Sequence, residues 1–144
     1  MEKPVEPIRA PLGWTTVDEP VNNYFKPSSF PWFMAKSHGL TNPQAIATSV
    51  IGMEPKFLFS AGEPGRFYLG HVPTWYVYEI IEPGTLEEIY RKMNESQERN
   101  LTMEKVELLD ITWEEMVEGL PEGAEECDLE SAKMLWDLRR KEPN

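Results

Sequence analysis

The residues best suited to acid–base chemistry near neutral pH are the two histidines, His38 and His71. His38 stands in the stretch AKSHGL, and His71 stands in LGHVP, between two expected strands. Either ring could move a proton, but a turn histidine is more often a hydrogen-bonded structural residue. No cysteine or further histidine stands near them at a metal-ligand spacing, so no metal site is expected.

The single cysteine, Cys127, is surrounded by five carboxylates in the stretch EGAEECDLE. Nearby negative charge disfavours the thiolate, so we expect a poor nucleophile. A single cysteine also excludes a disulfide within the chain. The chain contains no Walker loop, no G-x-G-x-x-G and no G-x-S-x-G motif. No recognisable set of reacting groups therefore points to an enzyme, and no cofactor is expected on this reading.

The acidic charge of the chain is concentrated in its second half. The net charge is −11, and residues 1–70 contribute nothing to it because they carry six acids and six bases. Between Glu104 and Glu130, eleven acids are opposed by Lys105 alone. Such a surface repels phosphates, so direct nucleic-acid binding is not expected, whereas a basic protein surface is the natural complement. The alternative is that the charge only keeps the protein soluble.

The leading hypothesis is a small acidic interaction or inhibitor-type protein that binds a basic protein surface through its C-terminal acidic half. Immunity proteins, viral inhibitors and nucleic-acid mimics belong to this class. Trp113 and Met116 could add an apolar anchor, although the same two residues would equally form the buried face of a short helix. The oligomeric state is not indicated. The predicted partner-binding residues are Glu104, Glu107, Asp110, Trp113, Glu114, Glu115 and Glu118.

The length of the chain predicts one domain, residues 1–144, with an extended Pro-rich arm at 1–31 and a body at 32–144. Seven of the thirteen prolines lie in residues 1–43, which favours irregular, extended backbone. The arm also carries large aromatic residues, so we expect it to wrap the body, with a short strand at 32–35. A third hypothesis follows, in which the segment Trp14–Phe33 docks a structural subunit into a larger assembly.

The sequence of the body, residues 32–144, predicts short helices and strands in alternation. Residues 41–53, TNPQAIATSVIGM, predict a helix, because Asn42 can cap it and Pro43 suits its first turn. GEPG is expected to form a tight turn. Strands are expected at 56–61, 66–70, 74–81 and 105–111.

The remaining patterns give the expected faces and caps. In the expected strand at 74–81, alternate residues point to opposite faces. One face carries Trp75, Val77 and Glu79, and the other carries Tyr76, Tyr78 and Ile80. Capping boxes, Thr85 with Glu88 and Thr112 with Glu115, begin two helices, and Asp128 is expected to cap the last one. The expected fold class is α+β: a small, mainly antiparallel sheet packed with three to four short helices and a Pro-rich wrapping N-terminal arm.

The order WFMAKS, helix, FLFSAGEP and WYVYEIIEPG, over residues 32–88, resembles the ADP-ribosyltransferases, in particular the rifampin-modifying and cholera-toxin-like branches. The resemblance places Phe33–Lys36 at the first family signature and Phe59–Ser60 at the second, with Tyr76 and Tyr78 on the aromatic strand. Met34 and Ala35 stand where the family has histidine and glycine, or arginine. The resemblance therefore also implies, as one alternative, an enzyme that has lost the signature residues of the family and its activity.

If the resemblance holds, it implies an NAD-dependent transferase. His38, Ser60 and Tyr76 would bind nicotinamide and its ribose, and Glu88 would stabilise positive charge on the sugar in the transition state. NAD is the cofactor under this alternative only.

The N-terminal stretch MEKPVEPIRAPLGW contains no apolar run, so no secretory signal is expected. No stretch approaches the ~20 apolar residues that a membrane span needs. We therefore expect a cytoplasmic protein that makes no membrane contact.

Overall fold

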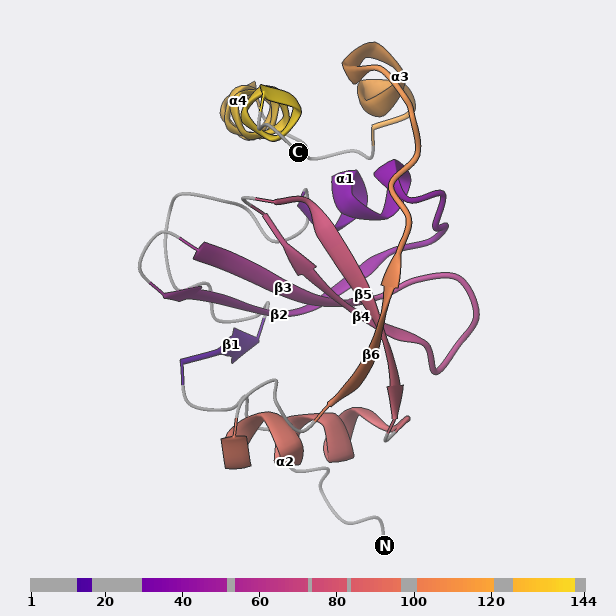
Figure 1. Cartoon of the computed structure of the whole chain (residues 1–144), viewed down its shortest axis with the longest axis vertical. Helices are drawn as coiled ribbons and strands as arrows, with labels where there is room; N and C mark the ends of the chain where they lie inside the picture. Colours follow the sequence, from indigo (N-terminus) through magenta and orange to yellow (C-terminus); the bar gives the residue numbers. More distant parts are fainter. Residues whose placement is uncertain are drawn as a thin grey trace, which may run out of the picture.

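The computed structural model describes residues 13–16, 30–51, 54–72, 74–82, 84–96, 101–120 and 126–141. Six strands and four helices follow one another along the chain in the order shown in Figure 1. The elements are β1 (Thr15–Thr16), α1 (Phe30–Ser37), β2 (Gln44–Ile51), β3 (Glu54–Ser60), β4 (Phe67–His71), β5 (Tyr76–Glu82), α2 (Leu86–Ser96), β6 (Thr102–Val106), α3 (Trp113–Val117) and α4 (Glu126–Lys141).

The strands form one six-stranded sheet in which every strand lies beside its neighbour in sequence, β1-β2-β3-β4-β5-β6. All five pairings are antiparallel. The centre of the register aligns Leu58 with Leu69, and Leu69 with Tyr78. The expected α+β class, with an antiparallel sheet and four short helices, is confirmed.

Helices cover the sheet on both faces, as Figure 1 shows. On one face, called here the α2 face, Leu58, Leu69 and Ile80 pack with α2 in a buried cluster. The opposite face, called here the α1 face, packs Phe57 and Phe59 against α1. Helices α3 and α4 lie beyond α1 on the same side. Alternate side chains of the central strands therefore enter two separate cores, as the period of two requires.

Large aromatic rings connect the α1 face to the outer helices. Phe30 of α1 stacks on Phe57, with ring centroids 5.7 Å apart. Trp75, at the β4–β5 turn, contacts Trp136 of α4 edge-on at 5.2 Å, and Phe33 of α1 stacks on Trp113 of α3 at 5.5 Å. Aromatic pairs of this kind add about 0.5–1.5 kcal/mol each beyond the area that they bury.

Several sequence predictions are confirmed at residue level. The register places Val77 opposite Gly70 and Tyr78 opposite Leu69, so β5 alternates as expected. At the start of α2, Glu88 N–H donates to the Thr85 hydroxyl at 3.2 Å, as the capping-box pattern predicts. The capping box at α3 is present in full.

Two predicted elements have the wrong type: an expected strand is a helix, and an expected helix is a strand. Residues 32–35, expected as a strand, lie in helix α1, and residues 41–53, expected as a helix, hold strand β2. In α1 the residues Phe30, Phe33 and Met34 follow helical spacing and are all buried, with Pro31 in the first turn. In β2 the β-branched residues favour extended backbone, and Asn42 lies in the preceding loop with φ 51°.

Two further boundaries differ from expectation. The strand expected at 105–111 is β6, which ends at Val106, because the chain then leaves the sheet and Leu109 N–H donates to Ser37 O of α1. Asp128 does not cap the last helix, since α4 already begins at Glu126. Of the expected arm at 1–31, the structure describes residues 13–16, where β1 pairs with β2, and residues 30–31, which begin α1; the rest lies outside the described residues. Among the helices described, none is both long and apolar enough to cross a membrane.

Gly70 is predicted to be required for the contact between β4 and α1. A Cβ at this position would lie 2.5 Å from Met34 Cε and 3.3 Å from a Phe59 ring carbon. Met34 is completely buried, so its side chain has little room to move aside. We expect Gly70→Ala to lower the free energy of unfolding by about 1–3 kcal/mol in urea denaturation.

The matched comparison is the same change in a Met34→Ala background. Removal of the Met34 side chain vacates the contested volume, so Gly70→Ala should then cost little. Additive losses in the double variant would show that the contact with Met34 is not the cause.

Candidate functional site

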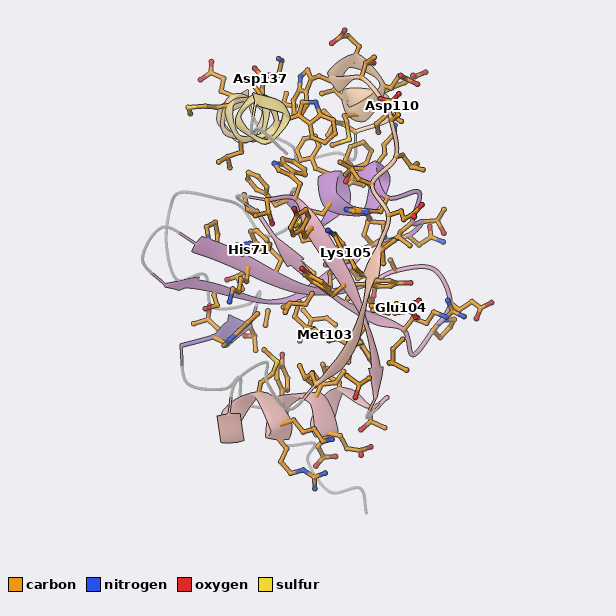
Figure 2. All side chains as sticks on the ribbon, viewed as in Figure 1. His71, Met103, Glu104, Lys105, Asp110 and Asp137 are labelled. Atoms are coloured by element: carbon orange, nitrogen blue, oxygen red, sulfur yellow. The ribbon has the colours of Figure 1, made fainter. Side chains whose placement is uncertain are left out.

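The acidic segment, defined here as residues 101–120, contains β6, the chain that follows it and α3. It carries six acids and one base, and all six acidic side chains are exposed. Figure 2 labels two of these acids, Glu104 on β6 and Asp110 in the chain before α3. The predicted partner-binding residues therefore lie along one continuous stretch, and its carboxylates face solvent.

His38 holds the acidic segment against α1. Its ring is 7% exposed, with Nδ1 2.8 Å from Glu107 O and Nε2 2.9 Å from Trp75 O. A carbonyl oxygen only accepts, so each contact requires an N–H on the ring, and both form together only when both nitrogens carry a proton. Leu109 N–H also donates to Ser37 O at 2.7 Å. The last turn of α1 thus fixes the backbone that presents Glu107 and Asp110.

A groove of about 580 Å³, called here the α1–α3 groove, opens between α1, the loop after it and the acidic segment. Trp32, Leu109 and Ile111 give it an apolar floor, while Glu115 and Glu118 stand at its acidic side. Leu109 is 44% exposed, so a large aliphatic side chain is open to solvent here. The residues that line the groove are Trp32, Lys36, Gly39, Leu40, Thr41, Asn42, Pro43, Leu109, Ile111, Glu115 and Glu118.

Lys36 brings a cation into this groove. Its Nζ lies 5.0 Å from the centroid of the Trp32 ring and donates a hydrogen bond to Glu118 O. A lysine over an indole face is attracted by the negative face of the ring. The groove therefore already accommodates one aliphatic stem with a cationic head, supplied by the chain itself.

Glu115 has a structural duty that its neighbours do not share. Thr112 N–H and the Thr112 hydroxyl both donate to its Oε1, at 3.0 and 3.1 Å. These two bonds, the backbone one first, hold the pKa of Glu115 below its ordinary value, and the Lys36 charge adds to the shift. Glu115 thus keeps its negative charge into mildly acidic conditions.

The two suggested anchor residues differ in accessibility. Met116 is completely buried, so it belongs to the core and not to a contact surface. Trp113 is half-buried against Phe33 and lines a second groove of about 510 Å³ between α3 and α4. That groove also contains Met134, which is 61% exposed. Trp113 is therefore accessible at one edge only.

The residues implied by the transferase resemblance do not converge. His38 lies beside α1, whereas Glu88 lies on α2, across the sheet, and receives a hydrogen bond from the Thr85 hydroxyl at 2.7 Å. Ser60 registers with Phe67 at one end of the strands, while Tyr76 registers with His71 at the other. His71 in turn faces Lys56, so Ser60 and Tyr76 stand four residues apart along the strand direction, or about 13 Å.

The order of elements also differs from the pattern behind the resemblance. That pattern needs a strand, a helix and a strand over residues 32–60, and the structure has a helix followed by two strands. No protein-family model, curated protein or solved structure matches this chain. Among the described side chains, no three His, Cys, Asp or Glu groups gather as a metal site would require.

Sequence reasoning missed the residues that shape the groove. Trp32 and Lys36 share a face only because residues 30–37 are helical, and this stretch was expected to contain a strand. Leu109 was expected inside a strand at 105–111. Its exposure follows from the departure of the chain from the sheet after Val106. The helical spacing of Phe30, Phe33 and Met34 was the signal that could have revealed the first pair.

Replacement of His38 is predicted to loosen the acidic segment. His38→Phe keeps an aromatic ring but leaves the carbonyls of Glu107 and Trp75 without their donor, which should lower the free energy of unfolding by about 2–3 kcal/mol. Hydrogen exchange measured by NMR at the Leu109 amide should accelerate. His71→Phe is the control, because His71 Nδ1 faces Thr74 within its own turn. Unchanged exchange at Leu109 in His38→Phe would contradict the proposed role.

Loss of the Thr112 hydroxyl is predicted to shift the titration of Glu115. A carboxyl whose pKa is lower in the folded than in the unfolded protein stabilises the fold through its ionised form. This contribution is fully present above the pKa of the unfolded state and is lost as the pH falls through the pKa of the folded state. Thr112→Val removes the hydroxyl bond, so the pKa of Glu115 should rise toward its ordinary value in an NMR titration of the side-chain carboxyl. Thr41→Val, at another exposed threonine, should leave the midpoint unchanged.

Proposed function

We propose that this protein binds a basic protein surface through the acidic segment and the adjoining α1–α3 groove. The observation that carries the proposal is the exposure of all six carboxylates of residues 101–120. A chain that needed these charges only for solubility would gain as much from an even distribution. Here they follow one run of backbone that His38 holds in place.

The chemistry of the groove favours lysine or arginine side chains as its occupants. Such side chains combine an aliphatic stem with a cationic head, which suits an apolar floor beside carboxylates. Lys36 makes this kind of contact within the chain, over Trp32 and on Glu118 O. A partner cation that enters the groove would compete with Lys36 or lie beside it.

The carboxylates fall into two functional groups. Glu107, Asp110 and Glu114 have no capping duty and can serve recognition, whereas Glu115 maintains the start of α3. Exposed charges of this kind mainly accelerate and orient association, and salt screens their effect. This behaviour is that of an inhibitor or immunity-type protein, or of a mimic that occupies a basic groove. The NAD-binding and structural-subunit alternatives rest on the sequence patterns alone.

Charge reversal in the acidic segment is predicted to weaken binding of a cationic probe. The probe is poly-L-lysine, and isothermal titration calorimetry gives its affinity for the double variant Glu107→Lys/Glu114→Lys. We expect a loss of about three- to tenfold relative to the parent protein at low salt, with the difference shrinking at high salt. Thermal unfolding should change little, because both side chains are exposed.

The matched control is Glu63→Lys/Glu87→Lys, which changes the net charge by the same amount. Glu63 lies in the β3–β4 turn and Glu87 in the first turn of α2, so each matches the local setting of its counterpart. An equal loss of affinity in both double variants would mean that net charge alone attracts the probe, and the proposed site would be rejected.

A further inference from the structure

Strand β6 forms an edge of the sheet, which is visible in Figure 1 beside β5. It pairs with β5 alone, and within the described residues no backbone hydrogen bond reaches the outer side of Met103–Val106. In an antiparallel strand every second residue directs its N–H and C=O away from its partner. The outer side of β6 therefore offers a ready template for one more strand.

On the α1 face, this edge carries a pair of like charges that is only partly compensated. Glu104 registers directly opposite Glu79 of β5. Arg66 Nη1 lies 3.7 Å from Glu79 Oε2 and offsets that charge in part, while Glu104 makes no ion pair with any described residue. Like charges opposite each other destabilise a sheet, so a cation delivered on the open side of Glu104 would relieve an existing repulsion.

On the α2 face, the same edge is apolar and aromatic. Lys105 lies over the Tyr76 ring, with Nζ 3.6 Å from the centroid, and its charge is thereby directed back over the sheet. Met103 packs against the cluster beneath α2. Figure 2 labels Met103, Glu104 and Lys105 along β6. Side chains of an added strand on this face would meet aliphatic stems and ring edges.

We propose that the outer edge of β6 receives an extended segment of the basic partner as an added strand. The segment alternates: a lysine or arginine lies opposite Glu104 on the α1 face, and apolar side chains lie beside Met103 on the α2 face. Main-chain hydrogen bonds provide the pairing, and the alternation provides the specificity. This inference rests on the proposed function, and names the kind of partner segment that the acidic segment recognises.

A second copy of this chain fits the edge less well. Symmetric antiparallel pairing centred on Glu104 would set this carboxylate opposite its own copy, and each chain brings a net charge of −11. Charge complementarity therefore favours a basic segment from another protein.

The test uses a hexapeptide that alternates valine and lysine, titrated into the full-length protein by calorimetry. It is compared with a peptide of the same composition in which the valines precede the lysines. Two further peptides carry backbone N-methyl groups, one on the three valines and one on the three lysines. In a strand, the residues that share a face also point their N–H groups to the same side. Pairing with β6 therefore predicts that one methylation pattern weakens binding at least about tenfold and that the other is tolerated.

The variant Glu104→Lys should weaken binding of the alternating peptide about three- to tenfold, because one attraction becomes a repulsion. The same charge change at Glu87→Lys, across the molecule on α2, should have no such effect. The melting temperature of Glu104→Lys should stay unchanged or rise, since the new lysine faces Glu79. A loss of binding in Glu104→Lys without loss of stability therefore reports on the edge itself.

The outcomes separate this inference from the proposed function. If both methylated peptides bind as well as the parent, the attraction is electrostatic only: the strand pairing is overturned while the acidic site stands. If neither the peptides nor poly-L-lysine bind, both proposals fall. If the protein instead self-associates in sedimentation equilibrium and the alternating peptide prevents this, the occupant is a second copy and the inference is wrong.

Discussion

Helix α1 is buried on two sides, and the position of the acidic surface depends on that double burial. Phe30 packs down onto Phe57 of the sheet, and Phe33 packs outward onto Trp113 of α3. The same helix ends at Ser37 and His38, whose hydrogen bonds hold the backbone at Leu109 and Glu107. Helix α1 thus forms most of the apolar contact between the sheet and the outer helices, beside the direct contact of Trp75 with Trp136 of α4.

Residues of the acidic segment differ in whether their backbone or their side chain is held by hydrogen bonds. The backbone of Glu107 is held by His38, so its side chain is free to face solvent. Glu115 is the opposite case, because its carboxylate is committed to the start of α3. A backbone held in place beside exposed carboxylates suits the proposed binding surface, because little conformational entropy would be lost when a partner arrives. The Glu79–Glu104 pair shows the cost of such an arrangement inside the sheet.

The sequence predicted those features that depend on local pattern. The alternation of β5 and the capping box of α3 each involve residues within a few positions of one another. The types of α1 and β2 were exchanged, because Asn42 and Pro43 looked like a helix start and the helical spacing in FPWFMAKS was overlooked. The acidic residues were found from composition, but the groove was not. The partners of His38 are backbone oxygens, which every residue carries, so the amino-acid sequence does not indicate which of them His38 contacts.

The neighbour-to-neighbour order of the sheet has a consequence for the time course of folding. Strands β2, β3 and β4 each pair with the strand that follows without an intervening helix, so the loops that must close are short. The contact between His38 and Glu107 instead joins residues that are 69 positions apart. Short loops close at a smaller entropic cost, so the hairpins should assemble early and the acidic segment should settle onto α1 late. During synthesis the C-terminal half also leaves the ribosome last, so the charged surface would be completed only after its scaffold exists.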